Sequence, residues 1–370
     1  MLKDDQGDGL YEEVIKKILF FGCILVAFFL LFLTVTAIWL GGLSYAILGI
    51  GAITATVSMS LIIWTPYKAK IYSIPLIIGL VPFYMILPGK GSFNSNGILE
   101  YRTVKDSGSP WFSGLSEQEL VSMGEKWGYS EQEKESIKNS GGLAKDYSGI
   151  SETNLYQQNA AVVLDSWFFD RGHYWFYGPA KEKRPLLIFL HGSGGNFKAY
   201  QQWFVPHAVK NEIAMAFPTW GFGVWSEKIL AARIDEIVLD IKKVNKIDDS
   251  KIYLCGLSQG SLTGIKTLNY LQFSPAGFIS ISGIPYLNPK DLKDICGYPM
   301  LVIHGEKDER VSVFNTRKIV DSLRFQKSKI EYIEFPHENH TLIKVKTDEV
   351  LQIIFNYINK IPTFENQKKY

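Results

Sequence analysis

The sequence predicts an α/β fold, a mostly parallel sheet flanked by helices, preceded by an α-helical transmembrane region. Three observations carry this prediction. Short apolar runs typical of buried strands alternate with amphipathic segments over residues 159–370. One of these strands leads through a glycine-bordered turn into a helix over residues 251–271. Three long runs without charge occupy residues 18–87, as expected of helices surrounded by lipid.

The overall composition excludes several classes of function. The 370 residues carry 39 Lys and Arg against 37 Asp and Glu, a net charge of +2. Because charge is so nearly balanced and no basic run is interleaved with aromatics, we expect no nucleic-acid partner. The cysteines are Cys23, Cys255 and Cys296, and none has the paired spacing of a zinc site. We therefore expect no metal site.

The N-terminal part is expected to cross a membrane. After a polar tail over 1–17, residues 18–90 form a predicted transmembrane region with helices at about 18–40, 43–64 and 71–87. About 20 apolar residues span a bilayer, so the third run is the shortest that could do so. The absence of a small-residue cleavage site after the first run argues against a secretory signal peptide.

Basic residues set the expected orientation. Lys16 and Lys17 precede the first run, and Lys68 and Lys70 lie between the second and third. Such residues favour the cytoplasmic side. The prediction is an integral, multi-pass protein in contact with membrane lipid, with its C-terminal domain on the non-cytoplasmic side. If the third run does not cross, that domain is cytoplasmic instead.

Residues 91–158 are predicted to be a linker or lid segment. They are rich in Gly, Ser, Asn, Glu and Lys, and Ser116 with Glu119 forms a capping-box pattern for a short helix. The pattern leaves open whether the segment folds over the C-terminal domain or is a solvated spacer. Residues 159–370 then form the predicted α/β domain.

The strands and helices of that domain follow one another along the chain. Residues 161–169 and 174–177 read as a hairpin. Predicted buried strands come next at 186–190, 212–218, 252–255, 277–282 and about 300–304. Ser226 precedes an amphipathic helix that runs to about Val244, and a final helix covers 347–358.

The turn after the strand at 252–255 has the pattern G-x-S-x-G. It reads Gly256-Leu257-Ser258-Gln259-Gly260. A serine nucleophile has to stand exposed on a strained turn at the end of a strand, and glycines two residues before and after it avoid collisions there. Ser258 is therefore the candidate nucleophile.

Candidate partners for Ser258 follow two later strands, in the order serine, acid, histidine. The run from His304 reads H-G-x-x-D-x-x-V, which makes Asp308 the candidate acid over its neighbours Glu306 and Glu309. The candidate base is His340, with His337 as its rival. In this arrangement the histidine takes the serine proton and the carboxylate orients the imidazole.

With these motifs in order, the chain resembles the α/β-hydrolase superfamily over roughly residues 160–360. Within it, the dienelactone hydrolase and phospholipase/carboxylesterase-like branch looks most similar. The resemblance implies a Ser258–His340–Asp308 triad that needs no metal or organic cofactor. It also implies an oxyanion hole made by the backbone N–H groups of Gln259 and Ser193, with Gly194 as the alternative to Ser193.

The substrate is less closely defined by the sequence. Trp220, Phe222 and Trp225 follow a strand end and are candidates to wall a substrate pocket. We expect a membrane-anchored serine hydrolase that cleaves carboxylic ester or thioester bonds in a small-molecule or lipid substrate. The alternatives are a prolyl-oligopeptidase-like serine peptidase, although no propeller-length region precedes the domain, and a non-catalytic binding protein with this fold.

Overall fold

The structure is a computed structural model. It describes residues 15–28, 30–31, 43–64, 71, 73, 75, 100–104, 129–141, 172–178, 182–193, 195, 198–219, 226–285 and 287–360. Predictions that fall on other residues, including the pocket candidates Trp220, Phe222 and Trp225, lie outside this range.

In the described part of the chain, eight strands form one sheet in the order β1-β2-β4-β3-β5-β6-β7-β8. Their bounds are β1 Glu100–Thr103, β2 His173–Tyr177, β3 Arg184–Leu190, β4 Ala214–Pro218, β5 Ile247–Leu257, β6 Gly277–Ile281, β7 Met300–Gly305 and β8 Ile330–Phe335. The strands from β4 to β8 pair in parallel, and β1 and β2 join antiparallel at one edge. The carboxyl ends of the parallel strands therefore share one edge of the sheet, where ligand sites of such sheets lie.

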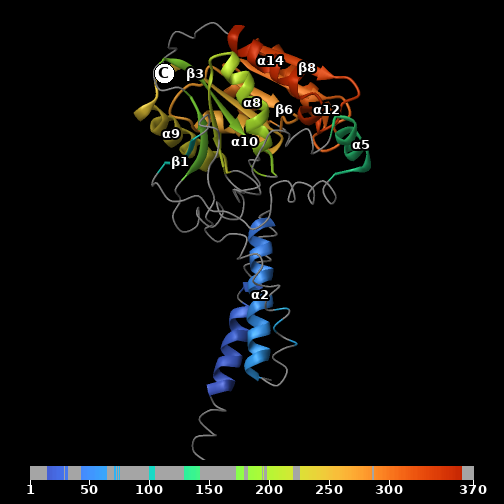
Figure 1. The fold of residues 1–370 in the computed structure, drawn as a ribbon. Helices are drawn as coiled ribbons and strands as arrows, with labels where there is room; N and C mark the ends of the chain where they lie inside the picture. The colour runs from blue at the N-terminus through green and yellow to red at the C-terminus, as the bar shows by residue number, and fades with distance from the viewer. Residues whose placement is uncertain are drawn as a thin grey trace, which may run out of the picture.

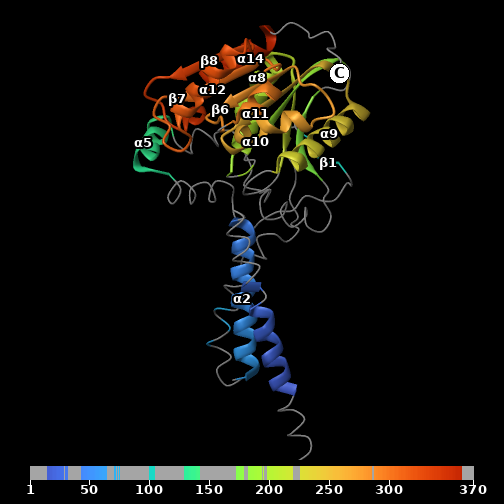
Figure 2. The same cartoon turned by 180° about the vertical axis from the view of Figure 1, so that it is seen from behind.

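Helices cover both faces of this sheet (Figures 1 and 2). One face carries α9 Glu227–Val244, α10 Gln259–Thr267, η2 Leu268–Tyr270, α11 Pro289–Ile295 and α12 Val313–Phe325. The other carries α8 Lys198–Lys210, α13 Leu342–Val345 and α14 Thr347–Lys360. The α/β part of the predicted fold class is thus confirmed.

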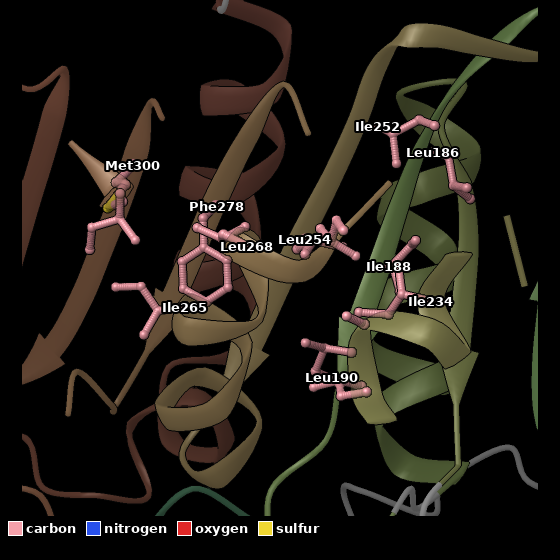
Figure 3. Packing of buried hydrophobic residues seen from close by; sticks show 14 of the residues in the cluster. Leu186, Ile188, Leu190, Ile234, Ile252, Leu254, Ile265, Leu268, Phe278 and Met300 are labelled. Atoms are coloured by element: carbon pink, nitrogen blue, oxygen red, sulfur yellow. The ribbon is translucent and has the colours of Figure 1, made fainter. Parts of the chain in front are cut away.

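Strand β3 shows how one sequence supplies both cores. Leu186, Ile188 and Leu190 belong to the cluster under α9 and α10, whereas Leu187 and Phe189 belong to the cluster under α8 and α14. Side chains alternate between the faces of a strand, so a continuous apolar run is what a doubly covered strand requires. Figure 3 shows the first cluster, in which Phe278 and Ile265 fill the space between sheet and helix.

Most predicted elements of this domain are observed close to their predicted bounds. The helix predicted from Ser226 to Val244 is α9, and the final predicted helix is α14. The sequence predicted that 174–177 pairs with 161–169 in a hairpin. In the structure β2 pairs with β1 and β4 instead. Residues 161–169 themselves lie outside the described range.

The predicted membrane location is wrong. Among the residues that the structure describes, no helix has both the length and the apolarity needed to cross a bilayer. The prediction of three spans at 18–40, 43–64 and 71–87 rested on missing charges. Of residues 71–87, the structure describes three.

Helix α2, Leu43–Trp64, coincides with the second predicted run. It lies beside the stretch 15–28, outside the α/β layers (Figures 1 and 2). Its hydroxyl side chains turn back onto their own helix, since Thr54, Thr56, Ser58 and Ser60 each donate to the carbonyl four residues earlier. The helix itself therefore satisfies the hydroxyl groups of these four side chains.

Two described elements fall within the predicted linker. Strand β1 extends the sheet, and helix α5, Glu131–Asn139, packs against α13. Helix α5 begins with a capping box between Ser130 and Glu133, whereas the capping box predicted at Ser116 lies outside the described residues. The division of the chain at 17, 90 and 158 stays a prediction.

Candidate active site

Ser258 lies on a strained turn between β5 and α10. Its backbone φ is 50° and ψ is −115°, a region that residues with a side chain rarely adopt. A hydrogen bond joins the turn to strand β6, because the Ser258 N–H donates to the carbonyl of Ile281 at 2.9 Å. The strain is thus fixed by strand β6 and lifts the serine hydroxyl to the end of the sheet.

The flanking glycines are required by close contacts of main chain. A Cβ on Gly256 would collide with the backbone of Ser261, and a Cβ on Gly260 would collide with the carbonyls of Leu190 and His191. Gly283, after β6, lies against the carbonyl of Ser258 in the same way. The G-x-S-x-G spacing is therefore a packing requirement of this turn, as its sequence suggested.

The structure brings Ser258, His340 and Asp308 together although each comes from a different loop. His340 Nε2 lies 2.9 Å from Ser258 Oγ, and His340 Nδ1 lies 2.8 Å from Asp308 Oδ2. A carboxylate only accepts, so Nδ1–H donates to Asp308 and Nε2 is left to accept the Ser258 hydroxyl proton. His340 is half-buried by this arrangement, with 12% of its side chain exposed.

The carboxylate of Asp308 is enclosed and fully hydrogen-bonded. Its Oδ1 accepts from the backbone N–H groups of Arg310 and Val311, both at 2.9 Å. Burial would raise its pKa, but hydrogen bonds from His304 and His340 outweigh burial and hold the pKa well below the ordinary 3.8. Asp308 is therefore ionised and oriented at neutral pH.

His304 also contacts the Asp308 carboxylate, although in the sequence it stands out only as the first residue of the H-G-x-x-D pattern. Its side chain is fully buried, and Nε2 lies 3.1 Å from Asp308 Oδ2 and 3.0 Å from the Val311 carbonyl. Because a carboxylate and a carbonyl only accept, Nε2–H donates to them, and Nδ1 is left to accept from the Thr316 hydroxyl at 3.1 Å. The spacing of four residues from His304 to Asp308 was the available signal.

The rival residues point elsewhere. His337 leaves 81% of its side chain exposed, and its Nδ1 lies 3.7 Å from Glu306. Glu306 also accepts the His337 backbone N–H at 2.9 Å. Glu309 is exposed on the surface of the same loop as Asp308. Of the two histidines and three acids considered, the structure joins only His340 and Asp308 to Ser258 among its described residues.

The expected oxyanion donors lie on two neighbouring segments. Gln259 is the first residue of α10, where backbone N–H groups have no partner within the helix and the dipole favours negative charge. Ser193 is exposed in the loop after β3, and Gly194 is outside the described residues. The preceding Gly192 approaches the elbow, since a Cβ there would lie 3.7 Å from that of Ser258.

His191 shapes the start of that loop. It is completely buried, and its Nδ1–H donates to the carbonyl of Gly192 at 2.7 Å. Burial lowers its pKa from 6.5 to about 4, so the imidazole is neutral. This matches a structural histidine better than a proton carrier. Among the described residues, no group of three or more His, Cys, Asp or Glu side chains is arranged to hold a metal ion.

In comparisons with known proteins, the chain matches the prolyl oligopeptidase family over residues 275–361, from β6 into α14. This segment includes Asp308 and His340 but not Ser258, and it is a minority of the chain. No curated protein matches the sequence.

Several solved structures are similar in fold. They include esterase PE8, with 16% identity and a TM-score of 0.43, covering 50% of this chain and 97% of that one. A thermostable esterase has 23% identity and a TM-score of 0.41, covering 50% and 59%. A phospholipase/carboxylesterase from Dyadobacter fermentans has 20% identity and a TM-score of 0.40, covering 50% and 96%.

The narrower branch of the resemblance, dienelactone hydrolase and phospholipase/carboxylesterase-like, stays a prediction. The coarser assignment rests on the chain itself. Strand order, elbow and the partial family match together support a serine hydrolase with an α/β-hydrolase fold.

Proposed function

We propose that this chain hydrolyses carboxylic esters or thioesters through Ser258, His340 and Asp308. The observation that carries the proposal is the unbroken hydrogen-bond chain from Ser258 Oγ through His340 to Asp308. Its order of donors and acceptors is the one in which a serine can lose its proton as it attacks. The alternative of a non-catalytic binding protein with this fold is disfavoured, because binding alone does not require these hydrogen bonds.

The proposed reaction has two halves. Ser258 Oγ bonds to the acyl carbon while His340 Nε2 takes its proton, and the tetrahedral intermediate then expels the alcohol or thiol, which receives that proton. Water next attacks the acyl carbon while His340 Nε2 takes its proton, and the second tetrahedral intermediate breaks its bond to Ser258 Oγ, which receives that proton as the carboxylic acid leaves. Asp308 holds the imidazole and stabilises its charge. The proposed chemistry uses no metal or organic cofactor.

Negative charge on the acyl oxygen needs donors that are already in place. We propose the backbone N–H groups of Gln259 and Ser193 for this role, supported by the position of Gln259 at the start of α10 and of Ser193 after β3. Trp220, Phe222 and Trp225 remain the proposed wall of the substrate pocket. The proposed substrate class is a small-molecule ester.

The experiment is labelling of the full chain with a fluorescent fluorophosphonate. Wild type should label, whereas Ser258→Ala should not, and hydrolysis of p-nitrophenyl esters should fall by about 10⁴-fold or more in that variant. Ser312→Ala is the matched control, since Ser312 is exposed and its hydroxyl makes no capping bond. Labelling that persists in Ser258→Ala would overturn the proposal.

A serine peptidase is the second candidate, favoured by the match to the prolyl oligopeptidase family. The same nucleophile serves both reactions, so labelling does not separate them. Turnover of p-nitrophenyl esters graded in acyl length, measured beside that of a proline p-nitroanilide, does. A higher kcat/KM on the anilide would replace the esterase proposal by the peptidase one.

A further inference from the structure

Helix α5 lies next to the loops that carry the acid and the base. We call residues 306–312 the acid loop and residues 336–341 the base loop. Figures 1 and 2 both show α5 beside the β7 and α12 end of the sheet, and it packs against α13, which follows the base loop. Ile137 of α5 is 3% exposed. A segment more than 100 residues earlier in the chain thus adjoins both loops.

Glu133 of α5 grips the acid loop. Its two carboxylate oxygens accept from Arg310 Nε at 2.7 Å and from Arg310 Nη2 at 2.6 Å, a two-pronged pair between residues 177 apart in sequence. Only 7% of the Glu133 side chain is exposed. Burial would raise its pKa, but hydrogen bonds from Arg310 and Ser130 lower it, so Glu133 is ionised.

Arg310, which Glu133 binds, also contacts the acid Asp308 directly. The backbone N–H of Arg310 donates to Asp308 Oδ1 at 2.9 Å, so the residue held by Glu133 also holds the carboxylate. Glu133 and Arg310 line a pocket of about 290 Å³ together with Lys307 and Asn339. The ion pair is therefore one of the connections between α5 and the acid loop, and the buried Ile137 is a further contact of this helix.

Ser136 of α5 contacts the base loop. The side-chain amide of Asn339 donates to Ser136 Oγ at 3.3 Å. Asn339 directly precedes His340, and Thr341 directly follows His340. The Asn339 Oδ1 accepts from both the backbone N–H and the hydroxyl of Thr341. Helix α5 therefore contacts Asn339, which precedes the base, and Asn339 in turn bonds Thr341, which follows the base.

We propose that α5 is a clamp that positions the acid and base loops against each other, with Glu133 and Ser136 as its positioning residues. Neither residue touches substrate. The inference rests on the proposed function and assigns a role to part of residues 91–158. A displacement of about 1 Å between reacting groups lowers a rate by about 100-fold, so contacts at this distance from the chemistry matter.

The variant Glu133→Gln tests the clamp. Glutamine keeps the shape of the side chain and the capping pattern but removes the charge that holds Arg310. Glu131→Gln is the matched control, because Glu131 is on the same helix with 89% of its side chain exposed and pairs with Lys134 at the surface. Both variants are made in the full chain.

Two measurements are made on each variant. Hydrogen–deuterium exchange follows peptides covering 306–312 and 336–341, and the rate of fluorophosphonate labelling follows Ser258. In Glu133→Gln we expect faster exchange in the acid loop and labelling slowed about 10- to 100-fold, with kcat reduced and KM little changed. Glu131→Gln should equal wild type in both.

The outcomes separate the two proposals. Equal exchange in Glu133→Gln and Glu131→Gln would overturn the clamp, and faster exchange with unchanged labelling would overturn its positioning role. A wild type that does not label would overturn the proposed function, while exchange still decides the clamp.

If Glu133→Gln does not fold, Ser136→Ala decides. It removes one hydroxyl and favours helix. Faster exchange confined to the base loop would support the clamp, and unchanged exchange there would overturn it.

Discussion

The proposed nucleophile and its two proposed partners are held in different ways. The elbow, residues 256–260, is fixed by main-chain contacts with strands β3 and β6, and its shape depends on glycines within the same five residues. The acid and base loops instead depend on side chains from other segments, including His304 of β7 and Glu133 of α5. A site of this kind has one locally encoded part and one part that only the folded chain assembles.

The largest expected effect tests the assembled part. His340→Ala should lower kcat/KM for a p-nitrophenyl ester by about 10⁴-fold, because the serine loses its base. His337→Ala, in the same loop, should stay within about twofold of wild type, since that imidazole is exposed and pairs with Glu306. Steady-state kinetics on both variants checks this, and the reverse ranking would exchange the two assignments.

The next effect tests the locally encoded part. Gly260→Ala should lower the free energy of unfolding by about 3 kcal/mol, since its Cβ would meet backbone carbonyls that cannot rotate away. Gly297→Ala is the control, because a Cβ there meets nothing within 4 Å. Urea unfolding measures both. A Gly260→Ala protein as stable as Gly297→Ala would show that the elbow tolerates side chains.

The smallest effect concerns pH. The pKa of Asp308 is lower in the folded protein than the ordinary 3.8, so its ionisation stabilises the fold above that value and this contribution is lost as pH falls below it. Wild type should therefore lose more stability than Asp308→Asn between pH 6 and pH 3, by on the order of 1 kcal/mol. Urea unfolding of both across this range checks the sign, with Glu309→Gln as control. Parallel curves would contradict it.

The sequence by itself determined the elbow and most of the sheet. Apolar runs such as 186–190 and 277–282 predicted strands because a parallel sheet buries both faces. The spacing around Ser258 was readable because the causes of the strain are a few residues away. The H-G-x-x-D run pointed to Asp308 for the same reason, although the buried contact of His304 with that carboxylate was not visible.

The tertiary structure decided which residues far apart along the chain contact one another. The sequence favours His340 over His337 as the base, and the fold brings His340 to Ser258 while it leaves His337 exposed. Ser130 and Glu133 show a capping pattern, but the pairing of Glu133 with Arg310 joins residues 177 apart, which no local pattern encodes. The three charge-free runs within residues 18–87 predicted membrane helices, whereas no helix among the described residues is long and apolar enough to cross a bilayer. Local backbone geometry depends on neighbouring residues, so it can be predicted from a short stretch of sequence. Contacts between side chains far apart in sequence depend on the tertiary fold, because the fold alone brings those segments together.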